Sequence, residues 1–563
     1  MVRWRVLLSC KRMVEAMVAA ALAISAAPAW VQDKRVPSAA TAVVEYRVQS
    51  GDTLFALLRD GADWQSVQRA NNIADPKRLL PDSLLRIPAH LLREQPTVAE
   101  VVHAYGNVTV TRASTETALP LAGGENLAAG DVVRTGVQSS TTLRFADGAR
   151  VLVRPDSELK IERLTQSRAG ASTTLRLERG SADSVVPPAQ GASAPSRYEM
   201  RTPQANLGVR GTEFRTAAEG GATRLEVLEG RVGARVGAGA ARTAPRAESF
   251  VAAGFGAVSA ATGMAAPRAL PAAPQLAGLP ERIERMPLRL SWQSAANTRV
   301  RAQVLTTEDP PRLVLDGVFD AAPARWSEDI ADGRYELRVR AIDADGLEGR
   351  DTRAAFVLKA RPEPPFIAAP TAGGRTIDES VRLAWTRNAA AARVRLQVAD
   401  TADFAQPRVD RNDVDATEAR VALPLGMHHW RVASILASGD QGPFSDAQSF
   451  TRMEPPPAPP PAEPQKNADG LLLRWPAPGS VAPAGTRWQV QVARDTAFAQ
   501  MVRDETLAEP QLLLRDPPSG TYYLRVKTID ADGFAGPFGQ AQQIEVPSSP
   551  WWWLVVPALL LLL

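Results

Sequence analysis

Short runs in which apolar and polar residues alternate fill the chain from Val101 to about Ser259. Neighbouring side chains of a strand point to opposite faces of its sheet, so this alternation predicts half-buried strands. Asp147-Gly148 and Pro155-Asp156-Ser157 stand between the runs and are typical of turns. Because no part of this range keeps a helical period, we predict a β-rich domain over residues 101–260. Its strands are expected at Val108–Val110, Thr142–Phe145, Val151–Val153, Leu159–Ile161, Leu175–Glu178 and Leu225–Val227.

The second half of the chain repeats one β pattern three times, at intervals of roughly 93 residues. Each copy begins with a tryptophan in an apolar strand and later reaches a strand that runs from a glycine to an Arg-Val pair. The matching positions are Trp292, Trp385 and Trp475, then Gly333, Gly426 and Gly520, and, for a ring in the late strand, Tyr335, His428 and Tyr522. The pattern resembles an immunoglobulin-like or fibronectin type III-like sandwich. We therefore predict three β-sandwiches, over residues 287–360, 366–452 and 467–547.

A smaller unit near the front of the chain combines strand and helix patterns. An alternating strand from Tyr46 leads to a Gly-Asp-Thr turn that can cap a helix. Two short helical patterns follow, and a second alternating strand ends at Pro88. The order predicts a βααβ unit over residues 45–90. The predicted fold class is thus a multidomain, mostly β protein in which this unit precedes the β-rich domain and three sandwiches.

The βααβ unit resembles a LysM module in its Gly-Asp-Thr-Leu turn, its Asn-Asn-Ile segment and its closing strand. The resemblance implies binding to the N-acetylglucosamine-containing glycan of peptidoglycan through backbone hydrogen bonds and apolar stacking. The implied contacts are Gly51, Asp52, Thr53, Leu54, Asn71, Asn72, Ile73, Asp75, Leu79, Leu80 and Pro81. Pro81-Asp82-Ser83 replaces the family's usual Pro-Gly-Gln, but aspartate tolerates positive φ and should keep the loop. A βααβ module without a ligand is the alternative.

Three segments of the β-rich domain resemble a FecR-type domain: Gly130–Thr135, Pro155–Leu159 and Thr202–Phe214. That family is known from periplasmic regulators of iron uptake, so the resemblance implies a periplasmic β domain and, with it, signalling. A signal peptide and the LysM-like unit precede the domain here, so we expect no cytoplasmic segment that holds a sigma factor. We interpret the domain as a binding or assembly unit. Arg210 and Glu213, the polar members of its last motif, are expected to form a structural ion pair or a turn contact.

The first 29 residues are typical of a secretory signal peptide, with a basic start, an apolar middle and small residues before the cleavage site. They hold four basic residues and one acidic residue, so their removal lowers the net charge from +4 to +1. This near-neutral charge does not favour nucleic-acid binding. The single cysteine, Cys10, leaves with the signal, so the mature chain is expected to contain no disulfide or thiolate metal site. We expect a protein of the periplasm or cell envelope.

Linkers are predicted at residues 30–44, 261–286 and 453–466. The last is mostly proline and favours an extended, semi-rigid spacer. Residues 551–563 form an apolar tail of three tryptophans followed by mainly aliphatic residues, too short to span a bilayer as a helix. We interpret the tail as a partly inserted membrane contact; docking on a sandwich or a truncated end are the alternatives. Ile342–Gly346 and Ile529–Gly533 are read as hairpin turns rather than calcium loops.

The sequence predicts no enzyme, no catalytic residue, no metal site and no cofactor. Its four histidines have no neighbours at metal-ligand spacing, and we find no nucleophile elbow and no phosphate loop. A catalytic carboxylate pair stays open, because sequence does not give distances. The main hypothesis is an exported envelope protein that binds peptidoglycan, with its β domains as a scaffold for an envelope protein partner. The alternatives are a periplasmic sensor or regulatory component acting through the FecR-like domain and, less favoured, an accessory cell-wall hydrolase.

Overall fold

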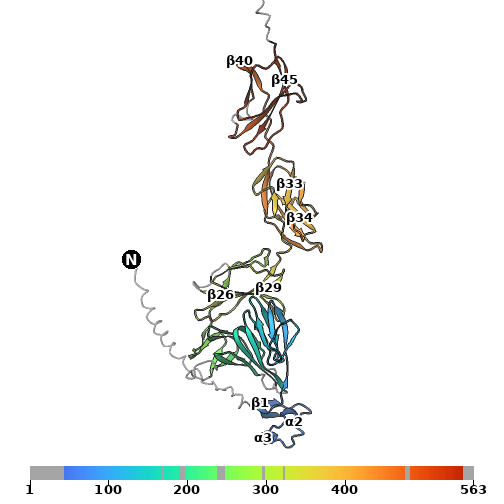
Figure 1. The fold of residues 1–563 in the computed structure, drawn as a ribbon. Helices are drawn as coiled ribbons and strands as arrows, with labels where there is room; N and C mark the ends of the chain where they lie inside the picture. The colour runs from blue at the N-terminus through green and yellow to red at the C-terminus, as the bar shows by residue number, and fades with distance from the viewer. Residues whose placement is uncertain are drawn as a thin grey trace, which may run out of the picture. The chain divides into compact units, whose positions relative to one another are not determined.

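The computed structural model describes residues 43–167, 170–188, 197–237, 248–293, 298–320, 324–475 and 482–548. They are mostly β and divide into two compact units (Figure 1). The first holds the chain up to Glu281 together with Pro287–Val357, and the second holds Arg282–Met286 and the chain from Leu358. The predicted signal peptide, nearly all of the first linker and the apolar tail lie outside the described residues. None of the helices in the described ranges is long and apolar enough to cross a bilayer.

The N-terminal unit is a pair of antiparallel strands with two short helices between them. Its elements are β1 (Val43–Arg47), α2 (Leu54–Leu57), α3 (Trp64–Ala70), β2 (Leu84–Pro88) and the 3-10 turn η1 (Ala89–Leu91). Thr53 accepts the backbone N–H of Ala56 and so caps α2. Asn71 ends α3, and its side chain bonds both backbone groups of Arg86, which ties the helix to β2. Exposed and buried side chains alternate along both strands, as expected for strands with one face on a small core.

The β-rich domain is wider than predicted and occupies residues 95–269. Its strands pair into a closed barrel (Figure 1). They are β3 (Gln95–Pro96), β4 (Ala99–Tyr105), β5 (Val108–Thr111), β6 (Ala118–Pro120), β7 (Asn126–Leu127), β8 (Val132–Thr135), β9 (Ser140–Arg144), β10 (Arg150–Val153), β11 (Glu158–Ser167), β12 (Gly170–Val186), β13 (Arg197–Arg201), β14 (Ala205–Val209), β15 (Thr212–Glu219), β16 (Ala222–Glu229), β17 (Arg231–Val236), β18 (Ser249–Ala252), β19 (Phe255–Ala260), β20 (Gly263–Met264) and β21 (Arg268–Ala269). The long strand β12 pairs with β11 along its first half and with β10 and β15 along its second half. It therefore connects two sets of strands within the barrel.

The first sandwich completes the first unit. Its strands are β22 (Gln275–Leu276), β24 (Leu288–Leu290), β25 (Trp292–Gln293), β26 (Arg299–Thr306), β27 (Leu313–Phe319), β28 (Ala324–Trp326), β29 (Gly333–Ile342) and β30 (Thr352–Leu358). The central pairing is β26 with β29, and β27 lies on the other side of β26. Trp292 is buried, as expected for the early tryptophan of a sandwich.

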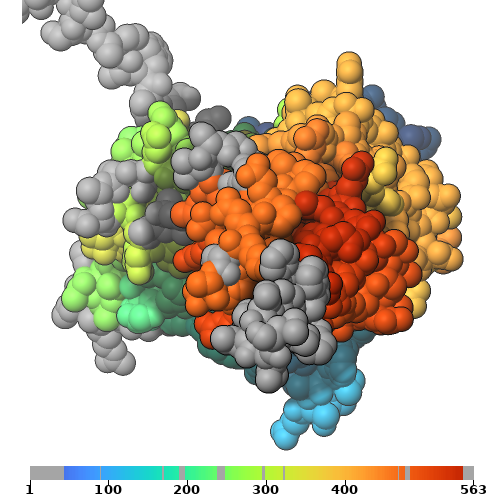
Figure 2. Space-filling view, turned by 90° about the horizontal axis from the view of Figure 1, so that it is seen from above, coloured from blue at the N-terminus to red at the C-terminus, as the bar shows by residue number. Residues whose placement is uncertain are grey.

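The second unit holds β23 (Arg282–Ile283) and two further sandwiches, whose surface is orange and red in Figure 2. The second sandwich comprises β31 (Ile367–Ala369), β32 (Gly374–Thr376), β33 (Ser380–Trp385), β34 (Arg393–Ala399), β35 (Val409–Val414), β36 (Glu418–Ala422), β37 (Gly426–Ile435), β38 (Gln441–Phe444) and β39 (Gln448–Arg452). The third comprises β40 (Glu463–Asn467), β41 (Gly470–Arg474), β42 (Arg487–Ala493), β43 (Met501–Leu507), β44 (Gln511–Leu514), β45 (Gly520–Ile529) and β46 (Gln542–Val546). Each packs its own apolar core around its tryptophans.

The ring that matches across the three copies forms the same contact each time. Tyr335 donates its hydroxyl to the carbonyl of Ala331 at 2.7 Å, and Tyr522 donates to Pro518 at 2.8 Å. His428 places Nε2 2.8 Å from the carbonyl of Pro424. All three acceptors lie four residues earlier, which is the tyrosine-corner arrangement of immunoglobulin-like sandwiches. A histidine therefore replaces the tyrosine in the second copy.

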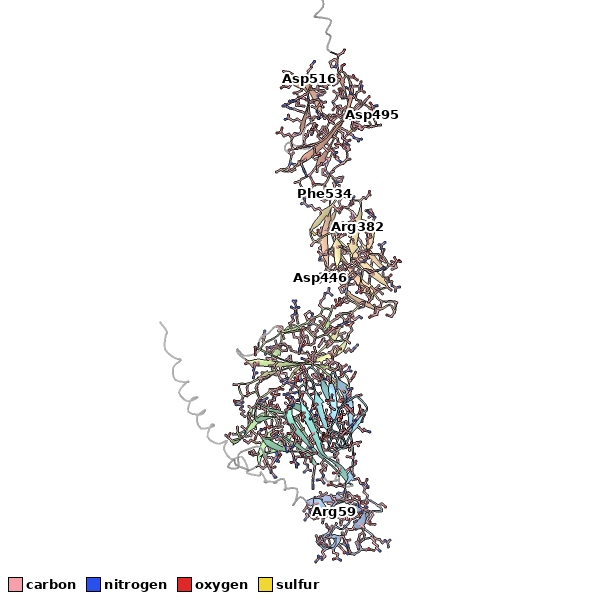
Figure 3. All side chains as sticks on the ribbon, viewed as in Figure 1. Arg59, Arg382, Asp446, Asp495, Asp516 and Phe534 are labelled. Carbon is pink, nitrogen blue, oxygen red and sulfur yellow. The ribbon has the colours of Figure 1, made fainter. Side chains whose placement is uncertain are left out.

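The two aspartate segments after the late strands are turns, as the sequence predicts. Asp343 Oδ1 accepts the backbone N–H groups of Asp345 and Leu347. Asp530 Oδ1 makes the equivalent contact with Phe534, which is labelled in Figure 3. Both carboxylates thus hold their own turn closed. The described residues contain no group of three or more His, Cys, Asp or Glu that fits a metal ion.

Two of the predicted linkers are packed against folded domains. Within 261–286, β20 and β21 pair with β19, and β22 pairs with β25. Within 453–466, the carbonyl of Pro457 accepts the hydroxyl of Thr528, and that of Ala462 accepts the side-chain amide of Gln542. Proline lacks an N–H but keeps its carbonyl, so a proline-rich segment can still be held by side-chain donors. The expected spacer is therefore docked on the third sandwich.

Candidate functional site

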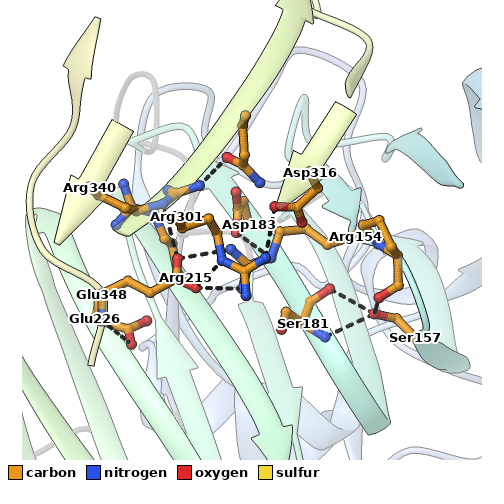
Figure 4. Close-up of polar contacts among 12 residues, drawn as sticks. Arg154, Ser157, Ser181, Asp183, Arg215, Glu226, Arg301, Asp316, Arg340 and Glu348 are labelled. Carbon is orange, nitrogen blue, oxygen red and sulfur yellow. Dashed lines mark hydrogen bonds and ion pairs between the residues drawn. The ribbon is translucent and has the colours of Figure 1, made fainter. Parts of the chain in front are cut away.

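The most unusual site in the first unit is a cluster of buried charges between the β-rich domain and the first sandwich (Figure 4). Strand register builds its lower half: Asp183 on β12 lies opposite Arg215 on β15, which lies opposite Glu226 on β16. Arg154 follows β10 directly and joins this row. Directly opposed residues of neighbouring strands lie on one face, so the three strands present one charged row.

The first sandwich supplies the other half of the cluster. Arg301 on β26 lies opposite Arg340 on β29, and Asp316 comes from β27. Glu348 and Asp351 follow β29, after the turn at Asp343. We call these side chains the joint cluster. Its members are Arg154, Asp183, Arg215, Glu226, Arg301, Asp316, Arg340, Glu348 and Asp351.

Glu348 is the centre of the joint cluster. Arg154 Nη1 and Nη2 lie 2.9 and 3.2 Å from its two carboxylate oxygens. Arg301 Nε lies 2.7 Å away and Arg340 Nε 3.1 Å away. Burial alone opposes ionisation, but the three guanidinium charges outweigh it and hold the pKa of Glu348 well below its usual value. Glu348 is therefore ionised at every pH near neutrality.

Two further contacts complete the network. Arg215 donates to the carbonyl of Gly349 at 2.8 Å and lies 2.8 Å from Asp351. Burial opposes ionisation of Asp351, yet Arg340 and Arg215 lower its pKa. Glu226 accepts the backbone N–H of Glu348 at 3.2 Å. Burial, and then the charge of Glu348, raises the pKa of Glu226 to about 7 although Arg215 opposes this.

Neutral hydrogen bonds surround the charged contact. Gln138 and Asp316 bond reciprocally: the Gln138 amide donates to the Asp316 carbonyl at 2.8 Å and accepts its N–H at 3.1 Å. Ser140 donates to the carbonyl of Leu313 at 2.8 Å. Arg150 lies 2.6 Å from Asp309 at the exposed rim. The first sandwich is thus bound to the β-rich domain by polar contacts over several strands.

A separate hollow of about 450 Å³ lies on the β-rich domain. It is lined by Asp156, Glu178, Arg179, Gly180, Pro203, Gln204, Ala218, Glu219, Gly220 and Gly221. Gly220 and Gly221 form the turn between β15 and β16, both with positive φ. Its rim is exposed and polar, with more acidic than basic side chains. Such a surface suits a transient protein contact better than a small apolar ligand.

The predicted glycan contacts fall into two groups. Asp52, Leu54 and Leu79 are 2%, 0% and 8% exposed, so their side chains form the core and cannot stack on a sugar. Asp52 accepts the hydroxyl of Tyr46 at 2.6 Å and the N–H of Gln49 at 2.9 Å, which explains its burial. The backbone N–H of Leu54 donates to the carbonyl of Pro76 at 2.8 Å, so the two predicted loops touch there.

The other predicted positions reach the surface to different degrees. Thr53, Asn71 and Ile73 are half-buried, and the first two are occupied by the capping contacts described above. The exposed members are Gly51, Asn72, Asp75, Leu80 and Pro81. Sequence reasoning overlooked an aromatic pair beside them: Phe55 is 41% exposed, and its ring centre lies 5.2 Å from that of Trp64. The aromatic residue directly after Leu54 was the available signal.

The two polar residues of the FecR-type motif lie in different environments. Arg210 is exposed, and Glu213 lies 3.9 Å from Arg353 of the first sandwich. Glu213 thus forms a structural ion pair of the expected kind, and its partner belongs to the first sandwich. The joint cluster itself was not predicted. Arg215 follows the core residue Phe214 in β15, so alternation places it on the opposite face of the strand, where the sequence predicts contact with water rather than with a second domain.

Comparison with known proteins finds one matching family and several similar structures. Residues 131–233 match the family model described as FecR protein, so the chain contains a FecR domain. No curated protein sequence matches the chain. A putative anti-sigma factor from Parabacteroides distasonis is similar in structure, with 16% identity and a TM-score of 0.20; the match covers 24% of this chain and 59% of that one.

Fibronectin-type structures are also similar. The FN1–FN3 domains of chicken CNTN1 match with 16% identity and a TM-score of 0.24, covering 49% of this chain and 98% of that one. The fibronectin(III)-like modules of Clostridium thermocellum CbhA match with 14% identity and a TM-score of 0.23, covering 32% and 93%. By its own strands and the family match, the chain is a mostly β protein that contains a FecR domain.

Proposed function

We propose that this protein is a component of cell-envelope signalling whose FecR domain recognises a protein partner. The match of residues 131–233 to the FecR family is the observation that carries the proposal. The resemblance to envelope regulators supplies the class of function. The predicted signal peptide over 1–29 supports export to the periplasm. We further propose that the chain is not an enzyme and that residues 551–563 contact a membrane.

We assign the partner contact to the rim of the hollow on the FecR domain. Glu178, Arg179 and Glu219 are exposed there, and the rim is polar. Charged rims set the rate and selectivity of protein association. A charge reversal at the rim is therefore expected to weaken partner binding without unfolding the domain.

The test compares transcription in host cells that carry the full chain, no chain, or a point variant. Glu178→Lys should reproduce part of the transcriptional change that deletion of the chain causes. Glu328→Lys, an exposed carboxylate of the first sandwich, is the matched control and should behave as wild type. An unchanged transcriptome after deletion of the whole chain would contradict the signalling proposal. Equal behaviour of the two lysine variants would contradict the assigned surface.

A second candidate function is binding to peptidoglycan by the βααβ unit. The half-exposed Phe55–Trp64 pair and the exposed Leu80 favour it, because partly exposed rings and apolar side chains are what line ligand sites. The test is retention of the full chain on purified sacculi. Phe55→Ala should reduce retention, whereas Leu119→Ala, an exposed apolar residue of β6, should not. If the wild-type chain is not retained, this second function is wrong.

A further inference from the structure

The contact between the FecR domain and the first sandwich has the composition of a reversible interface. The apolar core of the FecR domain is built from residues 99–257, and no residue of the sandwich belongs to it. The joint cluster and its surrounding hydrogen bonds connect the two domains instead. Buried ion pairs match surfaces to each other but add little net stability, because each charge loses its hydration. A sandwich that adds no side chain to the core of the FecR domain can therefore move away without unfolding that core.

We infer that the first sandwich is a reversible cover on the FecR domain, and that the protonation state of Glu226 decides whether the cover is closed. The inference rests on the proposed function, since it treats the FecR domain as the part that meets a partner. The covered face is the charged row on β12, β15 and β16 (Figure 4). It becomes available to a partner only when the sandwich moves away.

Charge balance within the joint cluster supports the role of Glu226. The cluster contains four arginines and five carboxylates, so the carboxylates are in excess by one. A further arginine, Arg353, lies 3.7 Å from Asp351 at the edge of the cluster, where its side chain is 47% exposed. Glu226 faces Arg215 on β15, Arg154 after β10 and Glu348 after β29, while Asp183 on β12 and Asp351 lie beyond Arg215. The residue opposite Glu226 on β19 is Gly256, which adds no charge. Asp183, Asp316, Glu348 and Asp351 each lie within 4 Å of an arginine nitrogen. Glu226 has no such ion pair among the described residues, which leaves it as the carboxylate that takes the proton.

The closed state binds the Glu226 proton more tightly than the open state does. In the closed state Glu226 is 2% exposed, and burial together with Glu348 raises its pKa to about 7. In the open state water solvates the carboxylate, and its pKa returns toward about 4.5. Closure therefore takes up a proton between these values, and a rise in pH favours opening. Below this range protonation of the other carboxylates would oppose closure again.

The experiment is hydrogen exchange of the purified full chain, without a partner, at about pH 5.5 and about pH 8. Exchange is followed in the segments 136–140 and 343–351, each of which bonds the opposite domain across the joint, and is corrected for the intrinsic pH dependence of amide exchange. The opening equilibrium of the wild type should increase roughly 25-fold across this range, as linkage to one carboxylate with these two pKa values requires. Glu226→Gln should stay closed at both pH values. Glu116→Gln, an exposed carboxylate between β5 and β6, is the control and should follow the wild type.

A wild type whose opening does not change with pH overturns the inference, and so does a pH response that survives in Glu226→Gln. The wild-type series needs no variant and decides the matter even if a variant misfolds. The transcriptional assay then separates the two proposals. If exchange depends on Glu226 but deletion of the whole chain leaves transcription unchanged, the cover exists and the signalling proposal fails.

Discussion

The carboxylate of Glu348 accepts hydrogen bonds from both terminal nitrogens of Arg154, at 2.9 and 3.2 Å. The two residues are 194 positions apart and belong to different domains. Their side chains are only 7% and 3% exposed. The pair therefore joins the FecR domain to the first sandwich at a point that water does not reach. Removing one member leaves the other charge buried without compensation, which costs more than the intact pair contributes.

Glu348→Gln should destabilise the first unit by about 3–5 kcal/mol, because three arginines then lose their main carboxylate. The double variant Arg154→Met, Glu348→Gln should cost clearly less than the sum of the two single variants. Urea denaturation of the full chain, followed in the first unit, measures both. Arg325→Met, an exposed arginine of β28, serves as control and should change stability little. A double variant whose loss of stability equals the sum of the two single losses would contradict the pairing of Arg154 with Glu348.

Glu226→Gln should change how stability depends on pH. The closed state raises the pKa of Glu226 to about 7. Ionisation of this group therefore lowers the free energy of unfolding of the wild type progressively between about pH 4.5 and 7, and the loss is complete above that range. Relative to the wild type, the glutamine variant should therefore gain about 3 kcal/mol as pH rises through this range. Below about pH 4.5 both should lose stability, because Glu348 and Asp351 have lowered pKa values and become protonated. A difference between variant and wild type that does not vary with pH would show that Glu226 does not titrate here.

Arg525 of the third sandwich is stacked between two rings, 4.0 Å from the centre of Phe498 and 4.5 Å from that of Phe538. Arg431 repeats this arrangement in the second sandwich. Arg525→Ala should destabilise the third sandwich by about 1–2 kcal/mol, through lost cation–π contact and the lost hydrogen bond to Gln491. Lysine should restore only part of this, because it lacks the flat guanidinium.

Thermal unfolding compares these variants with Arg503→Ala. Arg503 lies on the exposed strand β43 and pairs with Glu505 at 3.5 Å, so its loss should change stability by at most about 0.5 kcal/mol. Equal effects of Arg525→Ala and Arg503→Ala would contradict a special role for the stacked arginine.

Gly536 leaves room for the docked proline-rich segment. A Cβ at this position would lie 1.9 Å from the carbonyl oxygen of Pro456, which is backbone and cannot swing aside. Gly536→Ala should therefore displace the segment and destabilise the third sandwich by about 2 kcal/mol or more. Gly539 is the matched control, since its Cβ would lie 3.4 Å from the carbonyl of Pro459. Limited proteolysis within 453–466 should increase in Gly536→Ala and stay unchanged in Gly539→Ala.

The βααβ unit separates residues that hold the fold from residues that are free to bind. Asp52→Ala removes the acceptor of Tyr46 and Gln49 and should lower stability by about 1–3 kcal/mol. Phe55→Ala removes a half-exposed ring and should affect glycan retention more than stability. Sacculus retention and thermal unfolding, measured on both variants, check this. The distribution of roles is wrong if Asp52→Ala lowers retention while leaving the unfolding temperature unchanged.

Local patterns predicted much of the fold because their physical cause is local. Alternation of apolar and polar residues marks strands wherever one face is buried, and the three tryptophans lie in the sandwich cores as expected. The aspartate turns at Asp343 and Asp530 follow from side chains that bond their own backbone. The predicted FecR-type segments lie largely within the residues that match that family.

Burial of single side chains was harder to foresee. Asp52 and Leu79 stand in turns that resemble binding loops, yet both point into the core. A polar loop residue turns inward only where the core offers it a hydrogen-bond partner, as the hydroxyl of Tyr46 does for Asp52. The position of the proline-rich segment was equally hard to predict. Its composition favours an extended chain but does not show which domain that chain packs against.

From its residues alone this chain is determined to be a string of β domains with a FecR domain and three repeated sandwiches, since periodicity and turn chemistry act over a few neighbouring positions. Only the tertiary structure decides that the first sandwich covers the FecR domain, that Arg154 and Glu226 meet Glu348 there, and that Arg215 meets Gly349. Ion pairing across domains depends on strand register and on contacts between distant segments. No local pattern encodes these, because a charged residue looks the same in sequence whether it faces water or another domain.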